Sequence, residues 1–397
     1  MIRNKVEITT HAVNESTLKF TAETDTEKIA CINEEFKKRY LELNSIWDSN
    51  SILQIKAHRI RRFLHEFNNY RFEISSELTD KPIKITNAFM KMYEFLLFMT
   101  PVLTKFDSIK HYDIASAPGM FILAAYEYFK KRNIKYDWRA TSRENIDAGD
   151  LCDEYELFRN NPQKYSAVDV CSEEDIKNEI SKHKGSFELV SGDIGIDFNK
   201  DYSNYTLLEH QLPDQQWGQA RLAIELCKQG GVIFLKMFTY TSMQTHYLVD
   251  TVSEYFDKVY IVKPRTSKLM SEESYLIGIG RNSKDCNKVK LLRQKISEYI
   301  SKNIECFNEF EQERYISRRD VIEFVKYMIE NHKFTKDFFY TTEIYKKYFK
   351  ENDLLIDLFT LKLKDNHILN QYMYKGGGRS RCKSRSTHKN KSVKRNR

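Results

Sequence analysis

The chain of 397 residues is longer than one minimal domain and fits one large core domain with flanking segments. Its composition, 41% hydrophobic and 30% charged, is typical of a globular protein, and no apolar run reaches the roughly 18 residues that a membrane helix needs. The net charge of +8 comes from one end, because residues 375–397 hold ten Lys or Arg and no acid, and subtracting these ten leaves −2 for residues 1–374.

Residues 1–84 are predicted to form a helical N-terminal segment. The start, "MIRNKVEITT", lacks the apolar core of a secretory signal, so we expect a cytoplasmic protein, with the nucleus as an alternative. Two stretches with a helical pattern follow, "TEKIACINEEFKKRYLELNSI" and the amphipathic "SILQIKAHRIRRFLHEF".

From residue 85 to residue 282 the pattern changes to short β-rich runs that alternate with longer helical runs. This alternation predicts an α/β fold with a mostly parallel sheet. Seven strands are predicted, at His111–Ile114, Lys135–Ala140, Lys164–Val168, Phe187–Ser191, Val232–Lys236, Val259–Val262 and Ser274–Ile279. Helices are predicted between them at Phe121–Lys131, Tyr205–Lys228 and Ser242–Phe256.

A second helical segment is predicted at residues 283–374, where apolar residues again recur with helical spacing. The last part, residues 375–397, has almost no apolar residues and is predicted to be disordered. Its basic residues would add salt-sensitive affinity for nucleic acid, and a solubilising or targeting tail is an equal alternative.

The stretch "DIASAPGMF" puts a turn with small side chains between the first predicted strand and a helix. In an open α/β sheet, ligands bind beyond the carboxyl ends of the strands, and backbone N–H groups in such a turn can reach a polar ligand. The phosphate-loop pattern G-x-x-x-x-G-K-[ST] and the dinucleotide pattern G-x-G-x-x-G are both absent. On its own, the loop is either a simple strand–helix turn or a ligand site.

Polar residues also follow three later strands. Asp193 ends the stretch "FELVSGD", where a carboxylate either faces a cleft or caps a helix. Lys236 ends the apolar run "GGVIFLK", where an ammonium group is costly to bury unless it is paired, has a lowered pKa or reaches solvent. The basic loop "KPRTSKLMSEESY" is either a solvated hairpin loop or a place where phosphates bind.

The seven cysteines are dispersed along the chain and form no C-x-x-C pair. The ten histidines show no ligand spacing with them. This pattern argues against a disulfide framework and against a zinc site, so we expect no metal.

Together and in this order, these stretches resemble the FtsJ-like ribose 2′-O-methyltransferases, including the adrift-type cap methyltransferases and members from large cytoplasmic DNA viruses. "DIASAPGMF" matches the family's S-adenosylmethionine loop, and "GGVIFLKMF" matches its fifth strand. "KPRTSK" and "SEESY" match the loop and strand that follow, and "TNAFMKMYEFL" matches the helix that carries the first catalytic lysine. The resemblance covers residues 85–282 and implies a Rossmann-like methyltransferase fold with a seven-stranded, mostly parallel sheet between the two helical segments.

The resemblance also implies a cofactor, S-adenosyl-L-methionine, and an acceptor, the 2′-hydroxyl of an RNA ribose. The family's catalytic Lys–Asp–Lys–Glu tetrad falls on Lys91, Asp193, Lys236 and Glu273. The implied cofactor contacts are Ala115, Ser116, Gly119, Met120, Phe121 and Asp169, and the residues expected to bind RNA phosphates are Lys263, Arg265 and Lys268.

In the implied mechanism Lys236 is the general base that takes the proton of the 2′-hydroxyl. A lysine must be neutral to do so, and we expect burial and the nearby Lys91 to lower the pKa of Lys236. Asp193 would orient Lys236, Lys91 would stabilise the developing oxyanion, and Glu273 would hold Lys91 or the ribose.

Two loop positions depart from the family pattern, because Ala115 and Met120 stand where glycines are usual. The usual acid for the cofactor ribose is also missing, and only Ser142 or Glu144 lies near its position. These departures keep an alternative open, a non-catalytic RNA-binding or capping-complex subunit that retains the fold. For an enzyme, the cap-proximal nucleotide of mRNA is the first expected substrate and ribosomal RNA the second. A third hypothesis, compatible with either, is a helical interaction protein that uses residues 286–374 to dock a partner such as a polymerase or capping enzyme.

Overall fold

The structure is a computed structural model that describes residues 4–8, 35, 37–43, 67, 70–80, 83, 85–143, 156–195, 207–284, 301, 303–331 and 336–350. The basic tail, residues 375–397, and Glu144 lie outside the described residues. In the described part, no helix is long and apolar enough to cross a membrane.

One twisted sheet of eight strands forms the centre of the described part, in the order β1-β7-β8-β6-β5-β2-β3-β4. The strands are β1 (Asn4–Ile8), β2 (Ser108–Ile114), β3 (Lys135–Ser142), β4 (Tyr165–Ala167), β5 (Phe187–Gly192), β6 (Cys227–Met237), β7 (Phe256–Lys263) and β8 (Ser274–Arg281). The neighbours from β4 to β6 pair in parallel, and β8, β7 and β1 add antiparallel pairs at the other edge.

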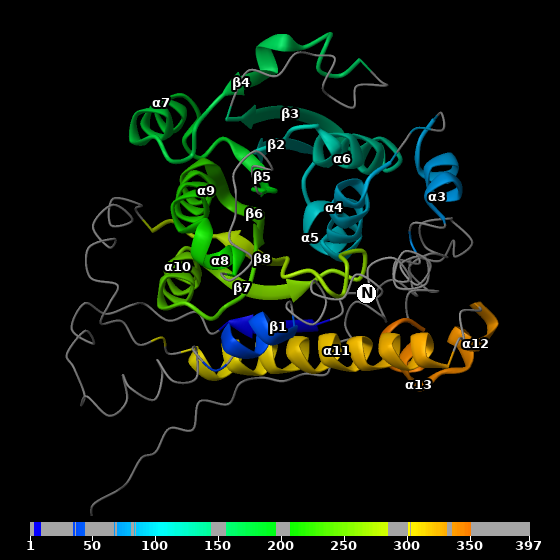
Figure 1. Ribbon diagram of the computed structural model, residues 1–397. Helices are drawn as coiled ribbons and strands as arrows, with labels where there is room; N and C mark the ends of the chain where they lie inside the picture. Colours follow the sequence, from blue (N-terminus) through cyan, green and yellow to red (C-terminus); the bar gives the residue numbers. More distant parts are fainter. Residues whose placement is uncertain are drawn as a thin grey trace, which may run out of the picture.

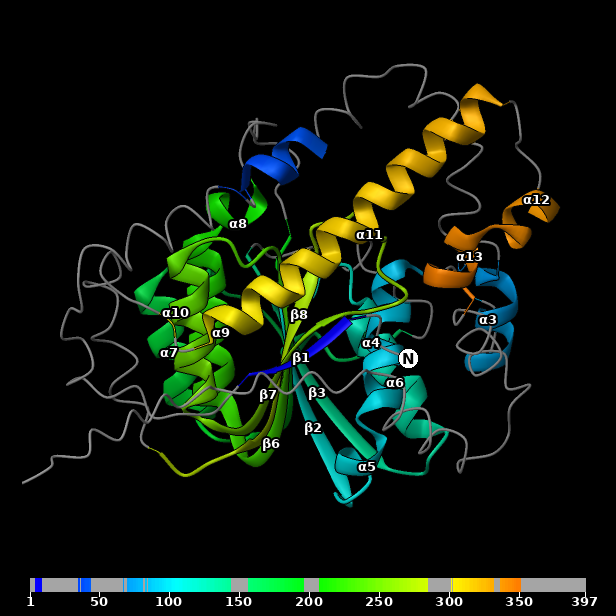
Figure 2. The same cartoon turned by 90° about the horizontal axis from the view of Figure 1, so that it is seen from below.

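Helices cover both faces of this sheet (Figures 1 and 2). In chain order they are α3 (Arg71–Leu78), α4 (Asn87–Phe98), α5 (Thr100–Leu103), α6 (Met120–Lys130), the short 3-10 helix η4 (Pro162–Lys164), α7 (Glu173–His183), α8 (Leu208–Gln211), α9 (Pro213–Leu226), α10 (Met243–Ser253), α11 (Ile304–Glu330), α12 (Lys336–Thr341) and α13 (Glu343–Tyr348). One apolar core lies between α4, α6 and the sheet, and a second lies between α7, α9, α10 and the opposite face. Because both faces are covered, every residue of β5 is buried, as is typical of a parallel strand.

The predicted α/β fold is confirmed, and each of the seven predicted strands corresponds to one of β2 to β8. The prediction of a purely helical N-terminal segment is wrong at β1, which pairs antiparallel with β7 and makes the sheet eight-stranded. The five residues of β1 carry little strand signal by themselves, and their pairing depends on the edge that β7 offers. The helix predicted at Tyr205–Lys228 is interrupted, because Pro213 begins a new helix, α9.

The long helix α11 lies along β1, at the edge of the sheet (Figure 2). Its first turns contribute Phe307 and Phe310 to the core that α10 covers. Its start is fixed by the buried Asp250 of α10, whose carboxylate accepts hydrogen bonds from Ser301 Oγ and Asn303 Nδ2, both at 2.6 Å. The helix α11 is therefore packed onto the sheet.

Candidate active site

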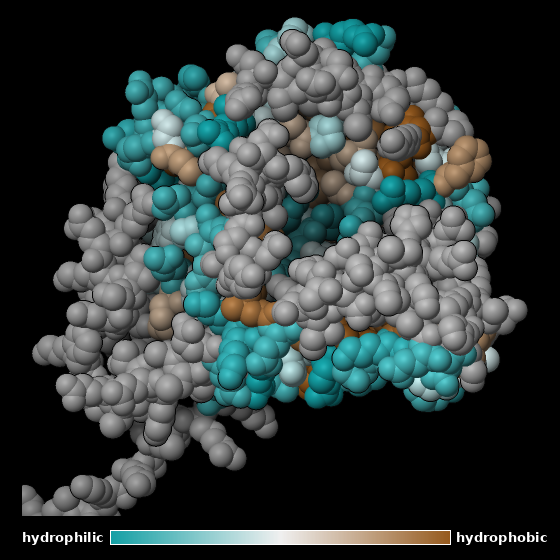
Figure 3. Space-filling model, in the orientation of Figure 1, coloured by the Kyte–Doolittle hydropathy of each residue, from teal (hydrophilic) through white to brown (hydrophobic). Residues whose placement is uncertain are grey.

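The candidate site lies at the carboxyl ends of the parallel strands. The strand order reverses between β2 and β5, and such a reversal opens a crevice in doubly wound sheets. The backbone N–H of Asp193, just after β5, donates to Ile114 O at the end of β2, so the two loops start side by side. Figure 3 shows a hollow in the centre of this face, where hydrophilic side chains gather.

The loop Ala115–Gly119 is fixed to the end of β3 by its backbone. Ser116 N donates to Thr141 O at 2.7 Å, and Ala117 N donates to Ser142 Oγ at 3.0 Å. The hydroxyl of Ser142, one of two residues considered for the cofactor ribose, is therefore already used to hold this loop. The loop is a preformed turn at the start of α6, as a ligand-binding loop requires.

Two residues of this loop have a left-handed backbone. Gly119 has a φ of +89°, and a Cβ at this position would lie 2.5 Å from ring atoms of Phe158, so only glycine fits. Ala115 has a φ of +56°, which costs an alanine roughly 1–2 kcal/mol. A glycine, which has no Cβ, would adopt this conformation without that cost.

Asp113, the last acid before the loop, has the character of a ligand-binding group. One oxygen of its buried carboxylate accepts a hydrogen bond from Ser191 Oγ, and the other has no partner among the described residues. Burial raises the pKa of Asp113 to about 7, despite the nearby hydroxyls of Ser116 and Ser191. An unpartnered buried carboxylate oxygen beside a backbone turn fits a ligand that carries both a positive charge and a carboxylate, as S-adenosylmethionine does.

The other predicted cofactor residues are placed differently. Met120 and Phe121, the first residues of α6, have side chains buried in the apolar core, so only their backbones can face the loop. Asp169 follows β4 and so lies on the carboxyl-end side of the parallel strands. Its Oδ1 accepts a hydrogen bond from Cys171 N at 2.9 Å. Asp169 remains a candidate contact, while Met120 and Phe121 serve mainly the core.

The four residues of the predicted tetrad meet beside this loop as two ion pairs. Lys236, on β6, lies with its Nζ 3.3 Å from Asp193 Oδ1. Lys91, on α4, donates to Glu273 Oε1 at the start of β8. The four come from distant parts of the chain, and two positive and two negative groups give a cluster with no net charge.

The electrostatics of the cluster differ from the sequence-based expectation. Burial lowers the pKa of Lys236, but Asp193 and Glu273 outweigh burial, so this pKa is raised from its ordinary value of 10.5. The expectation that the pKa of Lys236 is lowered is wrong. It weighed burial and the repulsion from Lys91, but not the attraction of the two carboxylates to the ammonium form. Burial would also raise the pKa of Glu273, yet Lys91, Lys236 and Lys263 hold it well below its ordinary value. Lys236 is therefore protonated and Glu273 is ionised at neutral pH.

Tyr275 joins the two ion pairs, and the sequence analysis did not single it out. Its hydroxyl lies 2.6 Å from Glu273 Oε1 and 2.9 Å from Asp193 Oδ1. The side chain is buried, and its ring stacks on Phe234 with centroids 4.2 Å apart. The sequence signal was the stretch "SEESY", which ends at Tyr275, and the β6–β8 register places this residue opposite Lys236. Tyr275 thus holds the two carboxylates at a fixed separation.

Tyr275→Phe is expected to lower the turnover of this site by about 10- to 100-fold, the effect of losing one hydrogen bond to a charged group. The ring packing stays, so the melting temperature should change little. Steady-state methyl transfer and thermal unfolding measure the two effects. Tyr112→Phe is the matched control, because Tyr112 is also buried and donates to a carboxylate, Glu179 Oε2 at 2.9 Å. Equal losses in both variants would contradict a role for Tyr275 in the tetrad.

The loop predicted to bind RNA phosphates is largely structural. Lys263 is buried, and its Nζ donates to the backbone carbonyls of Ser271 and Glu273. Arg265 is also buried, and its backbone N–H donates to Glu94 Oε1 at 3.0 Å, as Thr266 N does to Glu94 Oε2. Of the three predicted residues only Lys268 is exposed, so Lys263 and Arg265 would need a change of conformation to bind a phosphate.

A family model matches the part of the chain that carries this site. Residues 85–281 match the model of the FtsJ-like methyltransferases. A solved structure, a putative S-adenosyl-L-methionine-dependent methyltransferase from Methanococcus maripaludis, aligns over 50% of this chain and 89% of that chain, with 11% identity and a TM-score of 0.30. This structural likeness is too low to carry an argument.

Relatives in sequence come from viruses and from eukaryotes. A probable methyltransferase, EP424R of African swine fever virus, is 26% identical over 304 residues, covering 70% of this chain and 68% of that protein. An uncharacterized protein, L511 of Acanthamoeba polyphaga mimivirus, is 23% identical over 251 residues, or 60% of this chain and 31% of that protein. Cap-specific mRNA (nucleoside-2'-O-)-methyltransferase 2 of Drosophila melanogaster is 24% identical over 236 residues, or 55% of this chain and 33% of that protein.

Proposed function

The chain belongs, through residues 85–281, to the FtsJ-like methyltransferase family, and on that premise we propose that it methylates a ribose 2′-hydroxyl of RNA. The family uses S-adenosyl-L-methionine, which supplies a methyl group on a sulfonium sulfur when it is bound. The observation that carries the proposal is the meeting of Lys91, Asp193, Lys236 and Glu273 beside the loop Ala115–Gly119.

In this proposal the chain holds the cofactor with the loop Ala115–Gly119 and with Asp113. The backbone N–H groups at the start of α6 suit a carboxylate, and the unpartnered oxygen of Asp113 suits an ammonium group. The cleft would then place the attacking oxygen in line with the methyl carbon, and much of the rate would come from that alignment.

Lys236 is the proposed general base. In the free protein its raised pKa keeps it protonated, because Asp193 and Glu273 outweigh the effect of its burial. It loses its proton more easily when a second positive charge lies in the cleft, since like charges disfavour the ammonium form. Lys91 would stabilise the negative charge that develops on the ribose oxygen, and its pairing with Glu273 fixes its position.

We propose the cap-proximal nucleotide of mRNA as the substrate. The relative from Drosophila melanogaster is named a cap-specific mRNA (nucleoside-2'-O-)-methyltransferase, and a 33% identical stretch of 95 residues matches a second protein of that name from Trypanosoma cruzi. Lys268 is the exposed lysine of the basic loop and would contact an RNA phosphate. The viral relatives favour the cytoplasm as the compartment. The cap-specific names of the two other relatives make the capping machinery the partner that we propose.

One observation favours the alternative of a non-catalytic RNA-binding subunit. Ala115 keeps a left-handed backbone that suits glycine better, and its Cβ adds bulk to the loop that would hold the cofactor. The joined ion pairs of the tetrad oppose this alternative, because shielding four charged groups largely from water is costly for a scaffold that has no use for them.

The test is methyl transfer from tritium-labelled S-adenosylmethionine to short RNAs that differ only in their 5′ end. We expect label on the capped RNA and much less on the uncapped RNA. Equal labelling of both, or stronger labelling of a ribosomal RNA transcript, would contradict the cap-proximal substrate. RNA binding without any labelling would contradict the enzyme and support the non-catalytic subunit.

A further inference from the structure

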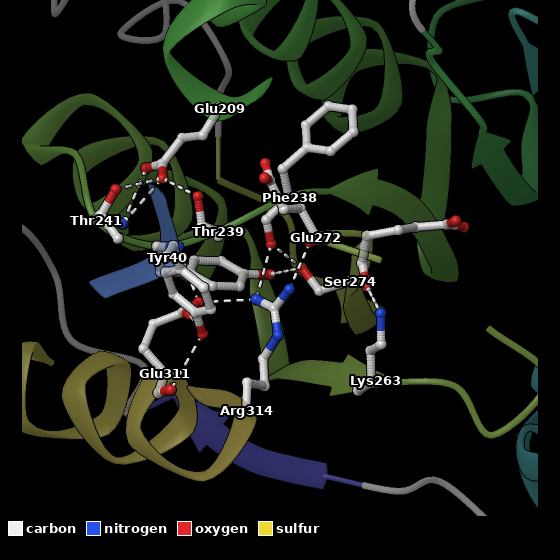
Figure 4. Close-up of polar contacts among 12 residues, drawn as sticks. Tyr40, Glu209, Phe238, Thr239, Thr241, Lys263, Glu272, Ser274, Glu311 and Arg314 are labelled. Carbon is white, nitrogen blue, oxygen red and sulfur yellow. Dashed lines mark hydrogen bonds and ion pairs between the residues drawn. The ribbon is translucent and has the colours of Figure 1, made fainter. Parts of the chain in front are cut away.

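The helix α11 lies outside the matched family domain, yet one of its side chains reaches the back of the active site. Arg314 is buried, and its guanidinium donates to two backbone carbonyls, Phe238 O at 3.1 Å and Glu272 O (Figure 4). Phe238 lies two residues after Lys236, and Glu272 directly precedes Glu273. One guanidinium therefore joins the two chain segments that carry a catalytic lysine and a catalytic carboxylate.

These two carbonyls lie where the β6–β8 ladder ends. Lys236 pairs with Tyr275 and Met237 with Ser274, and no pair follows. A strand pair is most mobile at its last residues, where the ladder hydrogen bonds stop. The planar fork of an arginine spans two carbonyls at once, so Arg314 continues the connection beyond the ladder. Ser274 Oγ adds to it by donating to Phe238 O at 2.6 Å.

A second set of contacts holds Arg314 in place. Glu311, one turn earlier on α11, accepts from Arg314 Nη1 at 2.8 Å and from Tyr240 N at 3.0 Å with the same oxygen. Its other oxygen accepts from Tyr40 Oη, which comes from the N-terminal part of the chain (Figure 4). Segments on both sides of the family domain thus contribute to one buried network behind the tetrad.

We infer that Arg314 is a positioning residue of the active site and that α11 is part of the catalytic unit. This inference rests on the proposed function. Arg314 touches neither reactant, and it acts by fixing the backbone after Lys236 and before Glu273. Its loss lets these two segments separate, so the two ion pairs lose their relative placement. A misplacement on the scale of 1 Å can cost on the order of 10²-fold in rate.

Arg314→Lys tests the inference, because lysine keeps the charge and loses the fork. We expect kcat to fall on the order of 10²-fold, with the KM values for both substrates nearly unchanged, since binding groups stay in place. Hydrogen–deuterium exchange should rise about tenfold in peptides that cover residues 236–240 and 271–275. The exchange is measured without substrates and needs no activity.

Arg281→Lys is the matched control. Arg281 is also buried, and it donates to the backbone carbonyls of Ile224, Asn282 and Lys284. It lies at the other end of β8 from Ser274, about 23 Å away at 3.3 Å per residue. We expect Arg281→Lys to lower the melting temperature about as much as Arg314→Lys does. Its kcat and its hydrogen–deuterium exchange at residues 236–240 should stay as in the unaltered protein.

A kcat within about threefold of the unaltered protein in Arg314→Lys would overturn the inference, and so would equal losses of kcat in both variants. If the unaltered protein transfers no methyl group to any RNA, the proposed function fails, and the exchange measurement decides the inference alone. Unchanged exchange at 236–240 and 271–275 in Arg314→Lys would then overturn it.

Discussion

Lys236→Met is expected to lower the rate of methyl transfer by about 10³-fold, which lies within the usual contribution of a general base. Methionine keeps the length of the side chain and removes the amine that would take the proton. The change leaves Asp193 without its cation, while Tyr275 still lies 2.9 Å from Asp193 Oδ1. Single-turnover transfer from labelled S-adenosylmethionine measures the chemical step without product release.

The same substitution elsewhere on β6 provides the control. Lys228 lies near the amino end of this strand, and its Nζ is 2.8 Å from Glu188 Oε1. Lys228→Met should leave the rate within about threefold, because this ion pair lies at the opposite end of β6 from the tetrad. A loss of less than tenfold in Lys236→Met would remove Lys236 from the role of base.

Asp193→Asn is expected to lower the rate by about 10²-fold at pH 9, because Lys236 loses the carboxylate that orients it. It is also expected to shift the pH profile toward lower pH. Asp193 is the main charge that keeps Lys236 protonated against the effect of burial, so an amide lowers the pKa of Lys236. In the unaltered protein the pKa of Lys236 is raised and lies above the pH of the assay, so only a small neutral fraction of Lys236 can accept a proton. Its kcat/KM should therefore rise about tenfold per pH unit between about pH 6 and pH 9. In Asp193→Asn this rise should level off at a lower pH.

Rates measured over this pH range at constant ionic strength give both profiles. Asp137→Asn is the control, because Asp137 pairs with Lys164 at 2.6 Å on β3, away from the tetrad. Its profile should overlay that of the unaltered protein. Identical profiles for Asp193→Asn and the unaltered protein would contradict the coupling between Asp193 and Lys236.

The central sheet could be predicted from the sequence because its strands carry their own signal. The alternation of apolar runs with helical stretches gave β2 to β8, and the polar residues at the strand ends marked the site. β1 could not be predicted in this way, because its place depends on the exposed edge of β7. The sequence alone also does not reveal that the loop beginning at Asp193 lies beside Ile114 at the end of β2.

The parts of the site that escaped prediction depend on neighbours distant in sequence. Tyr275 matters because the register of β6 and β8 places it opposite Lys236. Lys263 Nζ donates to the backbone carbonyls of Ser271 and Glu273, and a basic loop motif does not reveal these hydrogen bonds. The pKa of Lys236 depends on the balance between burial and two carboxylates. The direction of its shift can be known only from how close these carboxylates lie to the ammonium group.

The central claim is that Lys236 and its three partners activate a ribose hydroxyl. The most direct measurement is mass analysis of nucleosides released from an enzymatically methylated, capped RNA, made in parallel with Lys236→Met. The account predicts one 2′-O-methylated nucleoside next to the cap with the unaltered protein and none with the variant. A methyl group on a base, or the same ribose product from the variant, would contradict it.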